Sequence, residues 1–130
     1  VSNLVANGME VNMETPGSVD HDGSLLDYCR LHDITLQAWS PFQMPSWKGC
    51  FLGSDEYPEL NQKIRVLAEK YGVSDTTIAA AWILRHPAKT QVIVGTTNPE
   101  RLKAMCKGSE VVLTREEWYE IYRAAGHKIP

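Results

Sequence analysis

The segment VIVGTTNPER, residues 92–101, joins a strand-like run to the start of a helix. Its apolar residues are continuous rather than alternating, which is typical of a parallel strand covered on both faces. We therefore expect residues 91–95 to form the most buried strand of the chain. Gly95, Thr96 and Thr97 then lie at the carboxyl end of that strand, where parallel α/β proteins form their binding sites.

The residues that follow favour an anion at this strand end. Asn98 is expected to be the N-cap of a helix, with Pro99 at its first position. Unpaired backbone N–H groups and the positive end of the helix dipole would then point at the strand end. The hydroxyl groups of Thr96 and Thr97 and the guanidinium of Arg101 would add donors. The alternative is an ordinary strand-to-helix connection with a good cap and no ligand.

The rest of the chain alternates short apolar runs with longer helical patterns, which predicts βα units and a parallel sheet. Further strands are expected at 4–11 and 34–40, the first of them weak. The expected helices begin at Ser24 as N-cap (with Leu25, Tyr28, Cys29 and His32 at helical spacing), at Pro58 (to Tyr71), at Ser74 (to Arg85), at Asn98, and at Thr114, where Glu117 completes a capping box. The helix at 74–85 is apolar nearly all round and must be covered on more than one side.

The second strand end, AWSPF at residues 38–42, strengthens the case for a ligand. Trp39 would emerge at the same edge of the sheet as Gly95, with Ser40 beside it and Pro41 ending the strand. An aromatic plane close to an anion site is suited to a nucleotide cofactor. The competing interpretation makes Trp39 a core residue.

Composition limits the other classes of function. The 130 residues are 43% apolar, enough for one modest core, and carry a net charge of -3. This balance gives no basic footprint for nucleic acid, and no apolar run is long enough to cross a bilayer, so we expect a cytoplasmic protein. The three cysteines have no zinc-ligand spacing and are predicted to be reduced packing residues, without a metal site.

Residues 68–78 have the spacing of a helix-turn-helix, but the same charge balance argues against DNA binding. The second helix would present Asp75, Thr76 and Thr77 to DNA rather than basic side chains. We therefore interpret the match as a tight corner between two helices that requires Gly72.

Two segments resemble the NADP-dependent aldo-keto reductases, which are (β/α)8 barrels. LQAWSPF is similar to the seventh strand of that family, and GVSDTTIAAAWILRHPAKTQVIVGTTNPERLKAM to its seventh helix, eighth strand and following turn. LVANGMEVNM resembles the sixth strand, and LTREEWYEIYRAAGHKIP the terminal helix and tail. The resemblance implies an α/β fold that is the C-terminal part of the barrel, a single partial domain over residues 1–130.

The resemblance also implies roles for residues. Trp39 would stack on the nicotinamide of NADP(H), and Ser40, Pro41 and Phe42 would line the path of the pyrophosphate. The adenosine 2'-phosphate would be held by Gly95, Thr96, Thr97 and Arg101. The family's cofactor-binding glutamine has no counterpart after Asn7, and Met105 replaces an asparagine that contacts adenine.

The implied reaction is hydride transfer between NADP(H) and a small carbonyl or alcohol substrate. None of the family's catalytic Asp, Tyr, Lys and His has a counterpart in these residues, so the N-terminal half of the barrel is expected in the same chain and the isolated segment is expected to be inactive. The histidines and tyrosines present are expected to be structural or solvated. The loop bearing Trp47 and Phe51 and the tail at 127–130 are the expected places for substrate specificity. A non-catalytic nucleotide-binding relative and an inactive truncated fragment are the alternatives.

Overall fold

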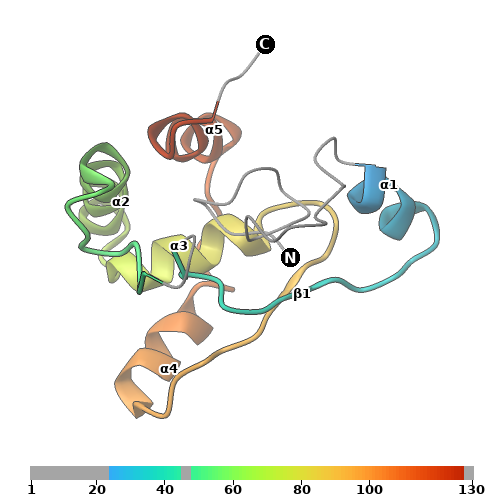
Figure 1. The fold of residues 1–130 in the computed structure, drawn as a ribbon, viewed down its shortest axis with the longest axis horizontal. Coiled ribbons are helices and arrows are strands. Elements are labelled where there is room, and N and C mark those ends of the chain that lie inside the picture. Colours follow the sequence, from blue (N-terminus) through green and yellow to red (C-terminus); the bar gives the residue numbers. More distant parts are fainter. Residues whose placement is uncertain (1–23, 45–47, 128–130) are drawn as a thin grey trace.

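The computed structural model describes residues 24–44 and 48–127, and the strand expected at 4–11 lies outside them. These described residues form seven elements: α1 (Ser24–Leu31), β1 (Gln37–Ala38), α2 (Pro58–Tyr71), α3 (Asp75–Leu84), β2 (Gln91–Val92), α4 (Pro99–Lys107) and α5 (Arg115–Ala124). Figure 1 shows how the helices lie around the strand β1. β1 and β2 pair in parallel, with Gln37 opposite Gln91 and Ala38 opposite Val92. The expected α/β class is therefore confirmed.

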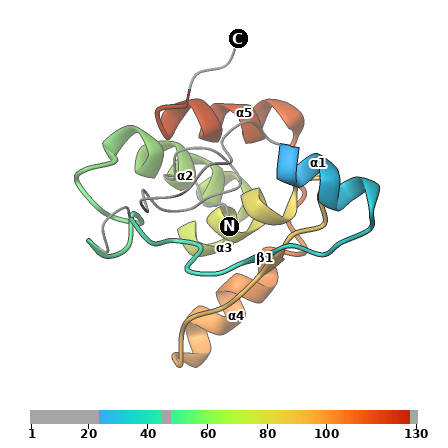
Figure 2. The same ribbon diagram turned by 45° about the vertical axis from the view of Figure 1, so that its right-hand side comes forward.

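Helix α3 forms the centre of the core. Seven consecutive residues, from Thr77 to Ile83, are buried, because α3 packs against α2, α4 and β2. In Figures 1 and 2 it runs between α5 on one side and α4 on the other. The all-round apolar pattern of this segment predicted that cover, and the prediction is confirmed.

The helix ends follow the sequence closely. Ser74 Oγ accepts a hydrogen bond from the Thr77 N–H at the start of α3. Thr114 and Glu117 form the predicted capping box at the start of α5. Gly72 ends α2 with φ +64°, a left-handed conformation that glycine adopts without strain. These three predictions are confirmed.

Helix α1 differs from its prediction. It already includes Ser24, which is therefore not its N-cap. Its buried residues are Leu26 and Cys29, whereas Leu25 and Tyr28 are exposed. Figures 1 and 2 both place α1 at the edge of the molecule.

Two stacked tryptophan side chains pack α5 against α3. The indole rings of Trp82 and Trp118 are stacked, with centroids 4.7 Å apart and planes 7° from parallel. Trp82 Nε1 donates to the Trp118 carbonyl at 3.1 Å, and Trp118 Nε1 donates to the Trp82 carbonyl at 2.9 Å. Each side chain thereby satisfies a backbone carbonyl of the other helix, while the Trp82 ring is buried and the Trp118 ring is partly buried.

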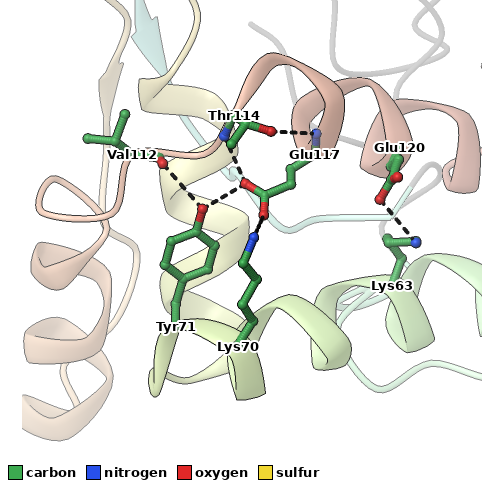
Figure 3. A network of polar contacts seen from close by, with 7 residues as sticks. All are labelled: Lys63, Lys70, Tyr71, Val112, Thr114, Glu117 and Glu120. Atoms are coloured by element: carbon green, nitrogen blue, oxygen red, sulfur yellow. Dashed lines mark hydrogen bonds and ion pairs between the residues drawn. The ribbon is translucent and has the colours of Figure 1, made fainter.

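A polar network joins α2 to α5 (Figure 3). The Glu117 carboxylate accepts hydrogen bonds from Lys70 Nζ at 2.6 Å, Tyr71 Oη at 2.7 Å and the Thr114 N–H at 2.8 Å. Burial raises the pKa of the Glu117 carboxyl, but these three donors favour the charged form and together bring its pKa below the usual value. The hydrogen bond to Glu117 and the negative charge of its carboxylate raise the pKa of Lys70.

The strands are shorter and more exposed than predicted. Only two residues of the expected strand at 34–40 and two of the one at 91–95 pair. The prediction that 91–95 is buried on both faces is wrong, since burial alternates along it and Ile93 is 40% exposed. The physical reason is the small number of neighbours. Among the described elements, β2 pairs with one strand, β1, and packs against one helix, α3.

The three cysteines differ in how exposed their side chains are. All three are free thiols, as expected, but only Cys29 is buried. The prediction that Cys50 and Cys106 are packing residues is wrong, because both are exposed.

None of the described helices is long and apolar enough to span a membrane.

Candidate functional site

The parallel pairing of β1 and β2 brings their carboxyl ends to one edge of the molecule. The segments that leave these ends line an open pocket of about 480 Å³. Its lining comes from both strand ends, from the loop before α2, and from α3 and α4: Ser40, Pro41, Phe42, Gln43, Cys50, Leu52, Thr76, Gly95, Thr96, Arg101 and Met105. The site is therefore assembled from segments that lie far apart in the sequence.

The β1 side of the pocket is a tight turn. Ser40 has φ +46°, a left-handed conformation that is uncommon for a residue other than glycine. The turn closes with a hydrogen bond of 3.0 Å from the Gln43 N–H to the Ser40 carbonyl. Pro41 is buried, and the Phe42 ring meets the Phe51 ring edge to face at 5.9 Å. This geometry turns the chain sharply away from the strand and into the pocket wall.

The β2 side supplies the positive charge. Arg101 stands on the first turn of α4 and lines the pocket together with Gly95 and Thr96. Within 24–44 and 48–127, its guanidinium has no ion pair or hydrogen-bond partner. A fully charged group that borders a pocket without a counter-charge is suited to binding an anion.

Six of the eight predicted site residues border this pocket. They are Ser40, Pro41, Phe42, Gly95, Thr96 and Arg101. Trp39, which is 40% exposed, and Thr97 adjoin these residues in sequence but are not among its lining. The structure thus brings most of the predicted residues together, while their roles toward a ligand stay predictions.

One predicted feature of the anion site is wrong. The amino end of α4 was expected to offer unpaired N–H groups, but the Asn98 side chain accepts from the N–H groups of Glu100 at 2.9 Å and Arg101 at 3.2 Å. An N-cap residue competes with any ligand for the same donors. The Arg101 guanidinium and the Thr96 hydroxyl remain, since Thr96 Oγ1 accepts from the Asn98 N–H and can still donate its own hydrogen.

Four lining residues were absent from the prediction, namely Gln43, Cys50, Leu52 and Thr76, and a fifth, Met105, was named only as the replacement for an adenine-contacting asparagine. Helical spacing gave a signal for Met105, which stands four residues after Arg101 on the same face of α4. The others reach the pocket through the path of the loop and the packing of α3, for which the local sequence carries no signal.

The pocket supplies binding groups rather than acid–base pairs. Among the described residues, those with shifted pKa values are Lys70, Tyr71, His86, Glu116 and Glu117, and none of them lines the pocket. Burial, with a smaller contribution from Arg30, lowers the pKa of His86, whose Nδ1 accepts a hydrogen bond from the Ala88 N–H. No group of three His, Cys, Asp or Glu side chains in the described part is placed to hold a metal ion.

The loop expected to determine substrate choice is only partly available for that role. Phe51 is fully buried between other apolar side chains, so it does not itself face a substrate, and the role of the loop in substrate choice stays a prediction. Trp47 and residues 128–130 lie outside the described part of the chain.

Comparison with known proteins places this architecture in a family. The model of the Aldo/keto reductase family matches residues 1–125. The chain belongs to the aldo/keto reductase family. That assignment confirms the resemblance found in the sequence, and the (β/α)8 barrel is the fold that it implies.

The aldo/keto reductase relatives are longer proteins. A 6-dehydroglucose reductase of Agrobacterium fabrum is 30% identical over 122 residues, which are 94% of this chain and 39% of that protein. Oxidoreductase YdhF of Escherichia coli is 30% identical over 111 residues, 84% of this chain and 36% of that protein. A 6-dehydroglucose reductase of Novosphingobium aromaticivorans is 28% identical over 109 residues, 81% and 34% of the two chains. The chain therefore spans less than two fifths of the length of these curated relatives.

Proposed function

We propose that the protein is an NADP(H)-dependent oxidoreductase of the aldo/keto reductase family, and that the pocket at the carboxyl ends of β1 and β2 is part of its cofactor site. The observation that carries the proposal is the guanidinium of Arg101, which lies beside Gly95 and Thr96 in that pocket and has no partner among the described residues. A guanidinium forks onto two phosphate oxygens at once, and the Thr96 hydroxyl can donate a third hydrogen bond.

The residues present fit the two ends of such a cofactor. In this proposal Arg101, Thr96 and Thr97 hold the adenosine 2'-phosphate against the backbone of Gly95, where no side chain intervenes. Ser40, Pro41 and Phe42 follow the pyrophosphate, and Trp39, partly exposed beside them, stacks on the nicotinamide. The apolar side chain of Met105, one turn beyond Arg101, contacts the adenine through dispersion rather than a hydrogen bond.

The cofactor would supply a hydride to a carbonyl carbon, or accept one from an alcohol. The described pocket binds and orients, and we assign no general acid or base to it. In this proposal those groups come from an N-terminal barrel half in the same chain, since the relatives extend well beyond the aligned segment. Small carbonyl compounds are the proposed substrates. The names of two relatives make 6-dehydroglucose the first one to test.

The 2'-phosphate gives the sharpest test, because NADPH carries it and NADH does not. We expect the protein to bind NADPH more tightly than NADH in a fluorescence titration. Arg101→Ala should weaken NADPH binding by about tenfold or more, the usual effect of losing hydrogen bonds to a charged group, and leave NADH binding unchanged.

Lys103→Ala is the matched control, since Lys103 lies on the same helix but is paired with Glu100 at 2.9 Å and does not line the pocket. Equal binding of the two cofactors, or equal effects of the two substitutions, would refute the assignment. Tight NADPH binding with no turnover of any carbonyl substrate would instead favour a non-catalytic nucleotide-binding protein.

A further inference from the structure

One wall of the pocket depends on a loop without regular structure of its own. Residues 48–57 lead into α2 and contribute Cys50 and Leu52 to the pocket. In the described part of this loop, the bridge between Gln43 and Cys50 is the only strand-like pairing. The backbone groups of such a loop need partners from elsewhere if it is to keep one conformation.

Asn61, in the first turn of α2, supplies these partners. Its side chain is buried, and Oδ1 accepts from the Gly53 N–H at 2.8 Å. Nδ2 lies 2.9 Å from the Phe51 carbonyl oxygen, 3.1 Å from that of Ser54 and 3.0 Å from that of Tyr57. A carboxamide carries an acceptor oxygen and two N–H hydrogens. The three carbonyl oxygens share these two hydrogens, so a single residue contacts the loop at four backbone atoms.

The anchored loop continues into the pocket. Phe51 is fully buried, its N–H donates to the Phe42 carbonyl at 3.0 Å, and the two rings meet edge to face. Phe42 lines the pocket, as do Cys50 and Leu52 on either side of Phe51. Fixing the Phe51 carbonyl therefore fixes three residues of the pocket wall.

We propose that Asn61 is a positioning residue for the ligand pocket. Its hydrogen bonds to the backbone of the 48–57 loop hold Phe42, Cys50 and Leu52 in the binding arrangement. Asn61 itself does not line the pocket and would not touch a bound cofactor. The part of this inference that concerns affinity rests on the proposed NADP(H) site. Without the carboxamide, the loop would populate other conformations, and the apparent Kd would rise as the fraction of protein with a formed pocket falls.

The test compares Asn61→Ala with Tyr71→Phe, a variant on the same helix that loses its hydrogen bond to Glu117 and does not border the pocket. NADPH titration is carried out well below the melting temperature of both variants. Asn61→Ala should raise the Kd about tenfold, the effect expected if one molecule in ten keeps a formed pocket. Tyr71→Phe should lower Tm and leave the Kd within about twofold. A wild-type Kd in Asn61→Ala, or an equal rise in Tyr71→Phe, would overturn the proposal.

Hydrogen exchange separates the anchor from the cofactor. The amide hydrogens of Phe51 and Gly53 should exchange faster in Asn61→Ala and at the wild-type rate in Tyr71→Phe. If the wild type does not bind NADPH, the proposed function fails, and the exchange rates still decide whether Asn61 holds the loop. If Asn61→Ala does not fold, Asn61→Asp keeps the size and the acceptor for Gly53 but loses the Nδ2 donors. It should change exchange and Kd in the same direction, and wild-type values would refute the inference.

Discussion

The helical interior and the rim of the pocket differ in how completely their polar groups are paired. In the interior, the indole N–H groups of Trp82 and Trp118 each find the other's carbonyl, and the buried Glu117 carboxylate accepts three hydrogen bonds. At the rim, the guanidinium of Arg101 has no partner among the described residues, and Ser40 is held at φ +46°. A charged group at a pocket and an uncommon backbone conformation are both typical of ligand-binding segments. Asp33 and Lys89 also have positive φ but do not line this pocket, so Arg101 rather than the backbone angle distinguishes the rim.

This difference separates two kinds of effect. Substitutions in the interior should change the free energy of unfolding, whereas substitutions at the rim should change binding and leave folding nearly as it was. Pairs of identical substitutions, one in each region, test this separation directly.

The largest effect is expected at Trp82. Trp82→Ala removes a ring that is 1% exposed and stacked on Trp118, and it leaves the Trp118 carbonyl without its donor. We expect the free energy of unfolding to fall by about 3–5 kcal/mol, measured by urea denaturation. Trp39→Ala, the same substitution at a position that is 40% exposed, should lower it by about 1 kcal/mol or less. Equal losses would show that the rim is as integral to folding as the core.

A glycine pair gives the next effect. A Cβ at Gly108 would stand 2.8 Å from Ala80 Cβ and 3.1 Å from the backbone nitrogen of Ala81, where α4 ends against α3. Gly108→Ala should therefore lower the free energy of unfolding by about 1–3 kcal/mol, the usual cost of overpacking. At Gly95 a Cβ would meet nothing within 4 Å, so Gly95→Ala should leave thermal unfolding unchanged. A fall in Tm for Gly95→Ala equal to that for Gly108→Ala would contradict the contrast.

The sequence predicted the interior better than the rim because its signals are local. The helix at Pro58–Tyr71 has the predicted bounds, and the caps at Ser74, Asn98 and Thr114 are the predicted residues. A capping side chain acts within three or four residues of itself, so spacing alone identifies it. The mutual hydrogen bonds of Trp82 and Trp118 span 36 residues and had no such signal.

At the candidate site, the sequence predicted the segments but not all the contacts. The two strand ends converge as parallel pairing requires, which is why Ser40 and Thr96 border one pocket. The burial of 91–95 was overestimated, because apolar content reports what a strand can pack against and not which neighbours are present. Asn61 was missed, since an asparagine in a helical pattern gives no sign of whether it faces solvent or a loop 7–10 residues earlier.

The Glu117 network predicts a pH dependence of stability. The pKa of Glu117 is lowered in the folded protein, so the carboxylate binds its proton less readily there than in the unfolded chain. Its stabilising contribution is then fully present above the unfolded pKa, about 4.3, and is lost as the pH falls through the folded value. Between pH 7 and pH 3 the free energy of unfolding should fall by about 1 kcal/mol through this group.

Glu117→Gln isolates that contribution. The difference in free energy of unfolding between wild type and Glu117→Gln should be largest at neutral pH and should shrink as the pH is lowered below 4, in urea titrations at each pH. Glu120→Gln is the control, because Glu120 pairs with Lys63 at the exposed surface and should show a much smaller change. A difference for Glu117→Gln that stays constant with pH would rule out the folded carboxylate as the source.

The smallest effect on folding is expected for Arg101, where binding should change most. Because its guanidinium has no partner among the described residues, Arg101→Ala should alter the free energy of unfolding by no more than about 0.5 kcal/mol. A ligand that binds only the folded state raises Tm, and about one hundred Kd of free ligand adds about 2.7 kcal/mol. NADPH should therefore raise the Tm of the wild type and of Lys103→Ala, and raise that of Arg101→Ala far less at the same concentration. A large loss of stability in ligand-free Arg101→Ala would mean that the charge belongs to the fold, and the distinction between a paired interior and a binding rim would no longer hold at its most important residue.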